Sequence, residues 1–221
     1  PGAALLAGVA ALRVGAGKLQ IGAPAAHALP LGLAVPEARV FALPATEDGE
    51  LASNGADEIT RWTERCDAVV VGPGLVEERA AGALALRLIE NAKVMVADAA
   101  AMPALAERPE AAHKLAGRLV LTPHAGEMAA LSGCSREAIE AEPAKAVRAL
   151  AARLQAVVAL KGAVTLVASP EGQVWRHAGG SPGLATAGSG DVLAGIIAGL
   201  IARGASPAQA GSPASAARTA P

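Results

Sequence analysis

The sequence predicts an α/β protein in which helices cover both faces of a mostly parallel sheet. Short runs of β-branched and aliphatic residues recur, and each is followed by Gly, Pro or a polar residue and then by a helical pattern. These runs are apolar throughout and do not alternate with polar residues, which is typical of strands buried on both faces. With 221 residues, the chain is long enough for one sizeable domain but not for two.

Five runs are expected to form strands, and a turn or a polar residue follows each one. They are residues 67–71 before "GPGL", 94–97 before Asp98, 119–121 before "TPHAGE", 157–160 before "KGA", and 164–168 before "SPEGQ". Helices are expected in the opening segment, at 77–89, 126–131 and 136–154, and after Asp191. The last two strands are close enough to pair locally. Because ligands bind at the carboxyl ends of parallel strands, the polar signals predict a ligand site at that edge.

The two parts of the chain differ in composition. Residues 1–204 carry the strand and helix patterns and are predicted to form the domain. The end, "GASPAQAGSPASAARTAP", is rich in Pro, Ser, Ala and Gly with almost no large apolar residue. Residues 205–221 are therefore expected to be disordered or loosely attached.

Composition and charge exclude several classes of protein. The 19 basic and 20 acidic residues give a net charge of −1, and one Phe, two Trp and no Tyr leave no stacking platform, so nucleic-acid binding is not expected. Every apolar run is interrupted before about 18 residues, which argues against a membrane span. Cys66 and Cys134 form no C-x-x-C pair and the four His form no H-x-x-x-H pair, so no metal-ligating residues are predicted. We expect a cytoplasmic protein.

Three catalytic or nucleotide motifs match only superficially. "GGSPG" fits a nucleophile elbow, but the residue after the serine is Pro182, which has no N–H for an oxyanion hole. "VVVGPGLVEE" has Glu77 where a dinucleotide fingerprint has its third glycine, and "VGAGK" lacks the spacing of a P-loop. None of these three matches is taken as a prediction of a catalytic or nucleotide-binding motif.

The segment from Gly188 to Asp191 precedes the apolar helix "VLAGIIAGLIARG". Glycines let consecutive N–H groups converge, and a helix start carries partial positive charge, so Gly188, Ser189 and Gly190 predict an anion site. Asp191 beside it suits general-base work on a hydroxyl that attacks a phosphoryl group. The alternative is that Asp191 only caps the helix. Gly195 and Gly199 are expected to allow close packing against the sheet.

Three other strand ends carry candidate residues. "TPHAGE" places His124 and Glu127 where a strand turns into a helix, and the alternative for this pair is a simple helix-entry turn. "KGA" places Lys161 and Gly162 where a phosphate could bind. Gly74, in "GPGL", lies in a tight turn that a ligand could approach.

Five segments together resemble the ADP-dependent NAD(P)H-hydrate dehydratase family, which has a ribokinase-like fold and repairs hydrated nicotinamide cofactors. They are "PGAALLAGVAALRVGAG", "VVVGPGL", "LTPHAGEMAAL", "LKGAVTLV" and "GGSPGLATAGSGDVLAG". The resemblance runs from Pro1 to about Gly204 and implies a three-layer α/β/α fold.

The resemblance also implies roles for single residues. Asp191 would contact the hydrate and act as base. The nucleotide would be held by Lys161, Gly162, Ala163, Val164, Thr165, Gly188, Ser189 and Gly190. The hydrate would be lined by Ala4, Gly74, His124 and Asp191.

The reaction implied is phosphorylation of the ring hydroxyl of the S-epimer by ADP (or ATP), with Mg²⁺, followed by loss of phosphate to restore NADH or NADPH. AMP is the other product. The resemblance also implies a homo-oligomer that works with an NAD(P)H-hydrate epimerase.

The chain departs from the family pattern at three places. Ala100 stands where the family commonly has a second acid after Asp98, and Val76 stands where a Gly is usual. The lead-in before Pro1 and the helical end after Gly204 are expected to be missing. Two other functions stay open: a ribokinase-like kinase that phosphorylates a stable alcohol, and a nucleotide-binding protein without catalysis.

Overall fold

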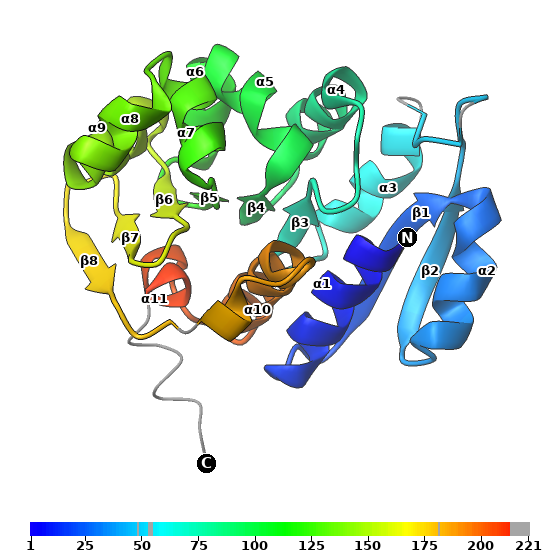
Figure 1. The fold of residues 1–221 in the computed structure, drawn as a ribbon. Coiled ribbons are helices and arrows are strands. Elements are labelled where there is room, and N and C mark those ends of the chain that lie inside the picture. Colours follow the sequence, from blue (N-terminus) through cyan, green and yellow to red (C-terminus); the bar gives the residue numbers. More distant parts are fainter. Residues whose placement is uncertain (48, 53–54, 181, 213–221) are drawn as a thin grey trace.

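The computed structural model describes residues 1–47, 49–52, 55–180 and 182–212 (Figure 1). The helices are α1 Gly2–Arg13, α2 Ala25–Ala34, α3 Gly55–Thr63, α4 Glu78–Leu88, α5 Met102–Glu107, α6 Pro109–Ala112, α7 Ala125–Ser132, α8 Arg136–Ala141, α9 Pro143–Leu154, α10 Ser189–Ala202 and α11 Pro207–Gly211. The strands are β1 Leu19–Pro24, β2 Ala38–Leu43, β3 Val69–Val71, β4 Met95–Ala97, β5 Leu119–Leu121, β6 Val157–Leu160, β7 Thr165–Ala168 and β8 Val174–His177. Short 3-10 turns occur at Ala99–Ala101, His113–Leu115 and Pro182–Leu184.

The main sheet has six strands in the order β3-β4-β5-β6-β7-β8. Strands β3 to β6 run parallel, whereas β7 is antiparallel to both β6 and β8. This confirms the mostly parallel sheet and the local pairing of the strands on either side of "KGA". A second sheet, formed by the parallel strands β1 and β2, was not expected from the sequence pattern.

The strands of the main sheet contribute to two cores, one on each face. In β5, Leu119 and Leu121 belong to the core under α4, α5, α7 and α9, whereas Val120 belongs to the core with α10 and α11. Successive side chains of a strand point to opposite faces, so a strand covered on both sides must be apolar at every position. Figure 1 shows α4 to α9 on one side of this sheet and α10 and α11 on the other. The three-layer α/β/α fold is confirmed.

Helices α1 and α10 pack against each other at very short range. A Cβ at Gly195 would lie 2.1 Å from the Ala7 carbonyl oxygen, and one at Gly199 would lie 2.4 Å from a methyl group of Val14. Both glycines therefore allow close packing, but the expected partner was wrong, because they face helix α1 and not the sheet. The contact brings the start of α1 to the same edge as the start of α10.

We expect Gly195→Ala to lower the free energy of unfolding by about 1–3 kcal/mol, because the methyl group would overlap backbone that side-chain motion cannot relieve. The matched control is Gly32→Ala in α2, where the new Cβ would meet only Val40, at 3.8 Å. In an open helix position Ala is better than Gly by roughly 0.5–1 kcal/mol, so the control should be neutral or stabilising. Denaturant unfolding of both variants measures this, and equal effects would contradict the close-packing explanation.

One predicted helix is two helices. The segment 136–154 is interrupted between α8 and α9, where Glu142 has φ −130° and ψ 57°. Pro143 causes the break, because proline lacks an N–H and disfavours helical geometry in the residue before it.

The expectation for the C-terminal segment needs correction over residues 205–212. Residues Pro207–Gly211 form α11, which begins at a capping box between Ser206 and Gln209. Ala210 is buried, and Gly211 lies against valines of β6 and β7. The rest of the predicted disordered tail, residues 213–221, lies outside the described residues.

Candidate active site

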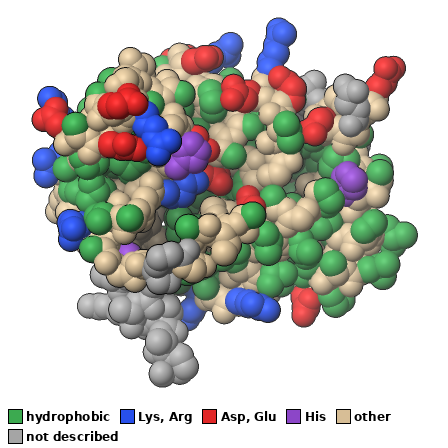
Figure 2. Space-filling view, viewed as in Figure 1, with side chains coloured by type: hydrophobic (Ala, Val, Ile, Leu, Met, Phe, Trp, Pro, Cys, Tyr) green, Lys and Arg blue, Asp and Glu red, His purple; other side chains and the backbone are tan. Residues whose placement is uncertain are grey.

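Three strand ends meet at the carboxyl edge of the sheet. Asp98 follows β4, Thr122 follows β5 and Lys161 follows β6, and these strands are neighbours. The parallel pairing continues past the strands as a bridge between His124 and Lys161, in which the Lys161 N–H donates to the Pro123 carbonyl at 2.7 Å. Figure 2 shows basic, acidic and His side chains gathered left of the centre of this face.

The centre of the site is a buried carboxylate. Asp98 is 3% exposed, and its Oδ1 accepts hydrogen bonds from Thr122 Oγ1 at 2.7 Å and from Lys161 Nζ at 2.9 Å. Lys161 Nζ also lies 3.8 Å from a carboxylate oxygen of Glu127. One ammonium group therefore lies between two carboxylates at the place where an anion site was predicted.

The "TPHAGE" segment forms a helix entry. His124 is the N-cap of α7, and its Nδ1 accepts from the N–H groups of Gly126 and Glu127 at 3.0 and 3.1 Å. Glu127 closes the capping box by accepting from the His124 N–H at 2.7 Å. The helix-entry alternative is therefore confirmed as the local structure. The His124 side chain is still 60% exposed, although its Nε2 lies 3.7 Å from a carboxylate oxygen of Glu127.

The glycine-rich segment begins α10 without a side-chain cap. Gly188 is the N-cap with φ +85°, and within the described residues no side-chain cap hydrogen bond is found at this helix start. The Ser189 N–H donates to the Thr186 carbonyl at 3.1 Å. Asp191 lies in the first turn, so the alternative that it serves only as the cap is wrong. Uncapped N–H groups at a helix start are suited to an anion.

Asp191 and Lys161 are brought to one place by this helix start. A Cβ placed on Gly190 would lie 3.5 Å from Lys161 Nζ and 3.8 Å from Asp98 Oδ2. The pKa of Asp191 is raised by burial and by the negative charge of Asp98, and Lys161 partly opposes this. A carboxylate with an elevated pKa beside an anion site is a typical candidate for a general base.

The "GPG" turn and the start of α1 lie together. Gly74 has φ +77°, and a Cβ on it would lie 3.1 Å from the Ala3 methyl group. Ala4, the predicted substrate residue, is the next residue in α1. Leu6, one turn along, has a methyl group 2.5 Å from where Gly188 would carry a Cβ. The first turns of α1 thus connect two of the predicted motifs.

The predicted nucleotide residues are distributed over two loops. Gly162, Ala163 and Val164 are exposed in the connection between β6 and β7, and Thr165 begins β7. Gly188, Ser189 and Gly190 lie at the start of α10. Lys161 joins the two groups through its position next to Gly190.

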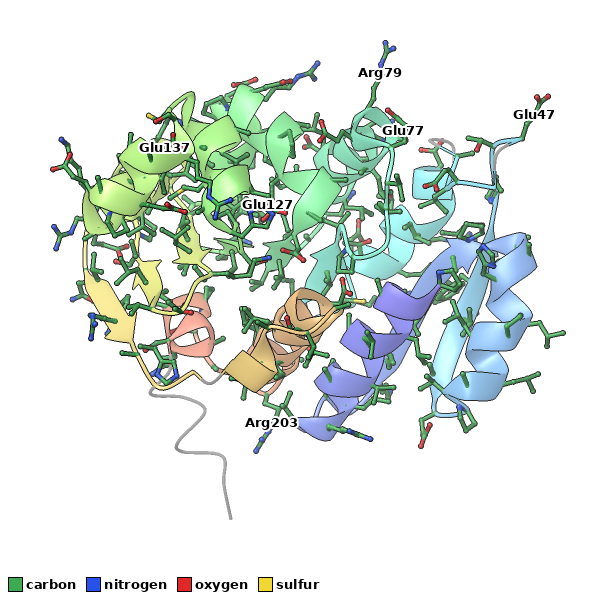
Figure 3. The ribbon with its side chains drawn as sticks, viewed as in Figure 1. Glu47, Glu77, Arg79, Glu127, Glu137 and Arg203 are labelled. Atoms are coloured by element: carbon green, nitrogen blue, oxygen red, sulfur yellow. The ribbon has the colours of Figure 1, made fainter. Side chains whose placement is uncertain are left out.

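Sequence reasoning missed Asp98 and Thr122 as site residues, and it left Glu127 open between a candidate site residue and a simple helix-entry residue. The sequence did contain a signal for Asp98: it is an acid directly after a fully apolar strand, a position that lies at the ligand-binding edge of a parallel sheet. Ala99, which follows it, has φ +47°, an uncommon value for a residue other than glycine. Figure 3 labels Glu127, which lies at the start of α7 on the side toward the middle of the molecule.

Solved structures with the same architecture identify the class of protein. A ribokinase-like superfamily protein from Enterococcus faecalis superposes with a TM-score of 0.76 at 26% identity, over 91% of this chain and 67% of that one. ADP/ATP-dependent NAD(P)H-hydrate dehydratase from Bacillus subtilis, co-crystallized with ATP/Mg²⁺, gives a TM-score of 0.72 at 29% identity, over 94% and 70%. Together with the uncapped helix start beside Asp191, these matches place the chain among the ribokinase-like proteins.

Sequence comparison gives the family. A family model described as NAD(P)H-hydrate dehydratase matches residues 1–220. The ADP-dependent (S)-NAD(P)H-hydrate dehydratase of Xanthomonas campestris is 47% identical over 205 residues, which cover 92% of this chain and 69% of the relative. The chain therefore belongs to the NAD(P)H-hydrate dehydratase family. It is also 40% identical to the bifunctional NAD(P)H-hydrate repair enzyme Nnr of Moorella thermoacetica, and spans 39% of that protein.

Proposed function

We propose that this protein restores NADH or NADPH from the S-epimer of the hydrated cofactor, using ADP and releasing AMP and phosphate. The observation that carries the proposal is the position of Asp191 in the first turn of a helix without a side-chain cap, directly after Gly190, which lies next to Lys161. Family membership supports the choice of substrate, and the site supports the chemistry. None of the described helices is long and apolar enough to cross a membrane.

The chemistry has two steps. Asp191 accepts the proton of the ring hydroxyl as the oxygen attacks the terminal phosphoryl group of ADP, and AMP leaves. The N–H groups at the start of α10 and the Lys161 ammonium stabilise the charge on the transferred group. The phosphorylated oxygen is then a good leaving group. The ring nitrogen supplies the electron pair that expels phosphate, and loss of a ring proton restores the reduced cofactor.

The ligands are assigned to the two sides of Gly188–Gly190. The adenosine nucleotide binds along Lys161 to Thr165, with its phosphates at Gly188, Ser189 and Gly190. The hydrate binds on the side of Ala4, Gly74 and His124, and its hydroxyl reaches Asp191. Two contacts of α1 support this arrangement: Ala3 lies against Gly74 on the hydrate side, and Leu6 lies against Gly188 in the phosphate loop.

Mg²⁺ is expected to arrive with the nucleotide. The described residues contain no cluster of three or more His, Cys, Asp or Glu side chains. Mg²⁺ usually keeps several waters and takes one or two carboxylates together with substrate phosphates, so a complete protein cage is not required. Glu127, at the open edge with a side chain 24% exposed, is the carboxylate suited to such an ion. When bound, the ion would neutralise charge on the transferred phosphoryl group.

The test is product analysis. The protein is incubated with the S-epimer of hydrated NADH, ADP and Mg²⁺, and reduced-nicotinamide absorbance and free phosphate are followed together. The two should rise in equal amounts, with AMP as the third product and no reaction when ADP is omitted. A phosphorylated hydrate that accumulates without NADH would mean a kinase. Binding of ADP without turnover would favour a non-catalytic nucleotide-binding protein.

Assembly, partner and location are part of the same proposal. A homo-oligomer and cooperation with an NAD(P)H-hydrate epimerase are expected from the family resemblance, and a cytoplasmic location is expected from the composition. Sedimentation of the purified protein measures the first of these, and a monomer at micromolar concentration would contradict it.

A further inference from the structure

Asp98 has no task in the two chemical steps, although it is the most buried charged group at the site. Its side chain is 4% exposed and ion-paired with Lys161. A buried carboxylate close to an anion site repels the anion and therefore weakens nucleotide binding. A contribution of Asp98 to the reaction would compensate for the weaker nucleotide binding.

We propose that Asp98 is a positioning residue, which pairs with the Lys161 ammonium and holds it in one orientation beside Gly190, where the phosphoryl group that is transferred would lie. This inference rests on the proposed function. It adds a residue to the reaction that the sequence did not single out.

The contacts define how Lys161 is held. Its backbone is fixed at the end of β6 by the bridge to the β5 end. Its ammonium is 2.9 Å from Asp98 Oδ1 but 3.8 Å from Glu127, so Asp98 makes the shorter contact. Asp98 is in turn anchored by the Thr122 hydroxyl at 2.7 Å. A lysine stem has four carbons and many rotamers, and this chain of contacts selects one of them.

The start of α10 lies directly beside the position in which the Lys161 ammonium is held. The Cβ position of Gly190 is within 4 Å of both Lys161 Nζ and Asp98 Oδ2, so the phosphate loop lies directly against the pair. Only interactions that are stronger in the transition state than in the ground state raise kcat. Because the ammonium is paired with Asp98, it attracts the resting phosphates less strongly, which lowers ADP affinity. It is, however, held in place for the charge that develops on the transferred phosphoryl group in the transition state.

Asp98→Asn should therefore change ADP binding and turnover in opposite directions. Asn keeps the size, and its Oδ1 can still accept from Thr122, but the substitution removes a negative charge and releases Lys161 from the ion pair, leaving at most a neutral hydrogen bond to hold it. We expect ADP to bind about fivefold more tightly, as one fewer nearby like charge implies. We expect kcat to fall by about 10- to 100-fold, as for a misplaced catalytic group. Damage to the fold would weaken ADP binding.

The pH dependence gives an independent readout. Two charged groups act on the Asp191 carboxyl: Asp98 from the end of β4 and Lys161 from the end of β6. From α1, which packs against α10, it is the uncharged Leu6 that lies against Gly188. Asp98 raises the pKa of Asp191, so Asp98→Asn lowers it. The acid limb of the kcat profile should then move to lower pH.

The experiment is a double-mutant cycle. ADP affinity is measured by calorimetry and kcat by NADH recovery for the wild type, Asp98→Asn, Lys161→Met and the double variant. The gain in ADP affinity from Asp98→Asn should shrink when Lys161 is Met, because the released ammonium is then absent. The matched control is Asp67→Asn, which breaks an exposed ion pair with Lys93 at 3.0 Å and should change neither quantity. Unchanged kcat, or weaker ADP binding in Asp98→Asn, would overturn the proposal.

The experiment can still be interpreted if the wild type is inactive or if the Asp98→Asn variant does not fold. If the wild type recovers no NADH, the proposed function fails, and the calorimetric cycle still decides whether Asp98 acts through Lys161. If Asp98→Asn does not fold, Thr122→Val takes its place, because it removes one anchor of Asp98 without changing the charge. It should lower kcat about fivefold, the value of one hydrogen bond, and unchanged kcat would overturn the proposal.

Discussion

Replacing Asp191 by Asn is expected to leave the fold intact and to lower kcat by about 10²- to 10⁴-fold, the usual contribution of a general base. The Asn side chain has the same size but cannot take the proton of the hydroxyl. Because Asp191 does not cap α10, the substitution removes no helix-capping bond. The measurement is NADH recovery from the hydrate at saturating ADP.

The stability of this variant follows from the raised pKa of Asp191, which has burial as its first cause and Asp98 as its second. A carboxyl with a higher pKa in the folded than in the unfolded state stabilises the fold while protonated, and this contribution is lost as the pH rises through the folded-state pKa. Asn is always neutral, so the variant should melt no lower than the wild type at neutral pH. Near-full turnover would show that Asp191 is not the base. A clearly lower melting temperature would show a structural role instead.

Gly72→Ala is expected to be the most destabilising single substitution at the site. Gly72 has φ +120°, and a Cβ would lie 1.8 Å from the carbonyl oxygen of Asp98. The overlap is with backbone, so it must push β3 and β4 apart. We expect a loss of about 2–5 kcal/mol from backbone strain and overpacking together. Since Asp98 would shift, activity should fall as well.

The control for this prediction is Gly117→Ala. Gly117 has φ +71°, and a Cβ there would meet nothing within 4 Å. The Gly117→Ala variant therefore has the backbone strain without the atomic overlap, and its free energy of unfolding should fall by roughly 1–2 kcal/mol. Denaturant unfolding compares the two variants. Equal losses of unfolding free energy would show that the overlap with the Asp98 carbonyl is unimportant. A larger loss for Gly72→Ala would give the energetic cost of that overlap.

Much of the fold could be predicted because the strands are short and strongly patterned. Strands β5 and β6 were predicted with the bounds that the structure has, since each is an apolar run ended by a polar or turn residue. Strand β1 was missed, because only one of its faces is buried and Gln20, Gly22 and Pro24 interrupt its apolar pattern. Strand β8 was missed for a similar reason, because Arg176 and His177 make it look like a loop.

The sequence selected several residues that the structure brings to the candidate site, but not the carboxylate at its centre. Lys161, His124 and the Gly188–Asp191 segment were selected because each follows a strand or begins a helix. Asp98 met the same condition, yet its importance depends on Lys161, which is 63 residues away in the sequence. The order of strands β4, β5 and β6 makes them neighbours, and a local pattern does not contain that order.

By itself, the sequence determined the layered α/β class, and it selected one edge of the sheet, with Asp191 and the glycines before it, as the candidate ligand site. These features depend on local signals: runs of apolar residues, helix starts and turn residues. Only the tertiary structure decided that α1 is the partner of Gly195 and Gly199, that the segment after Gly204 buries Ala210, and that Asp98 holds Lys161. Each of these depends on the distance between segments far apart in the chain, which is set by how the layers pack and not by any one segment.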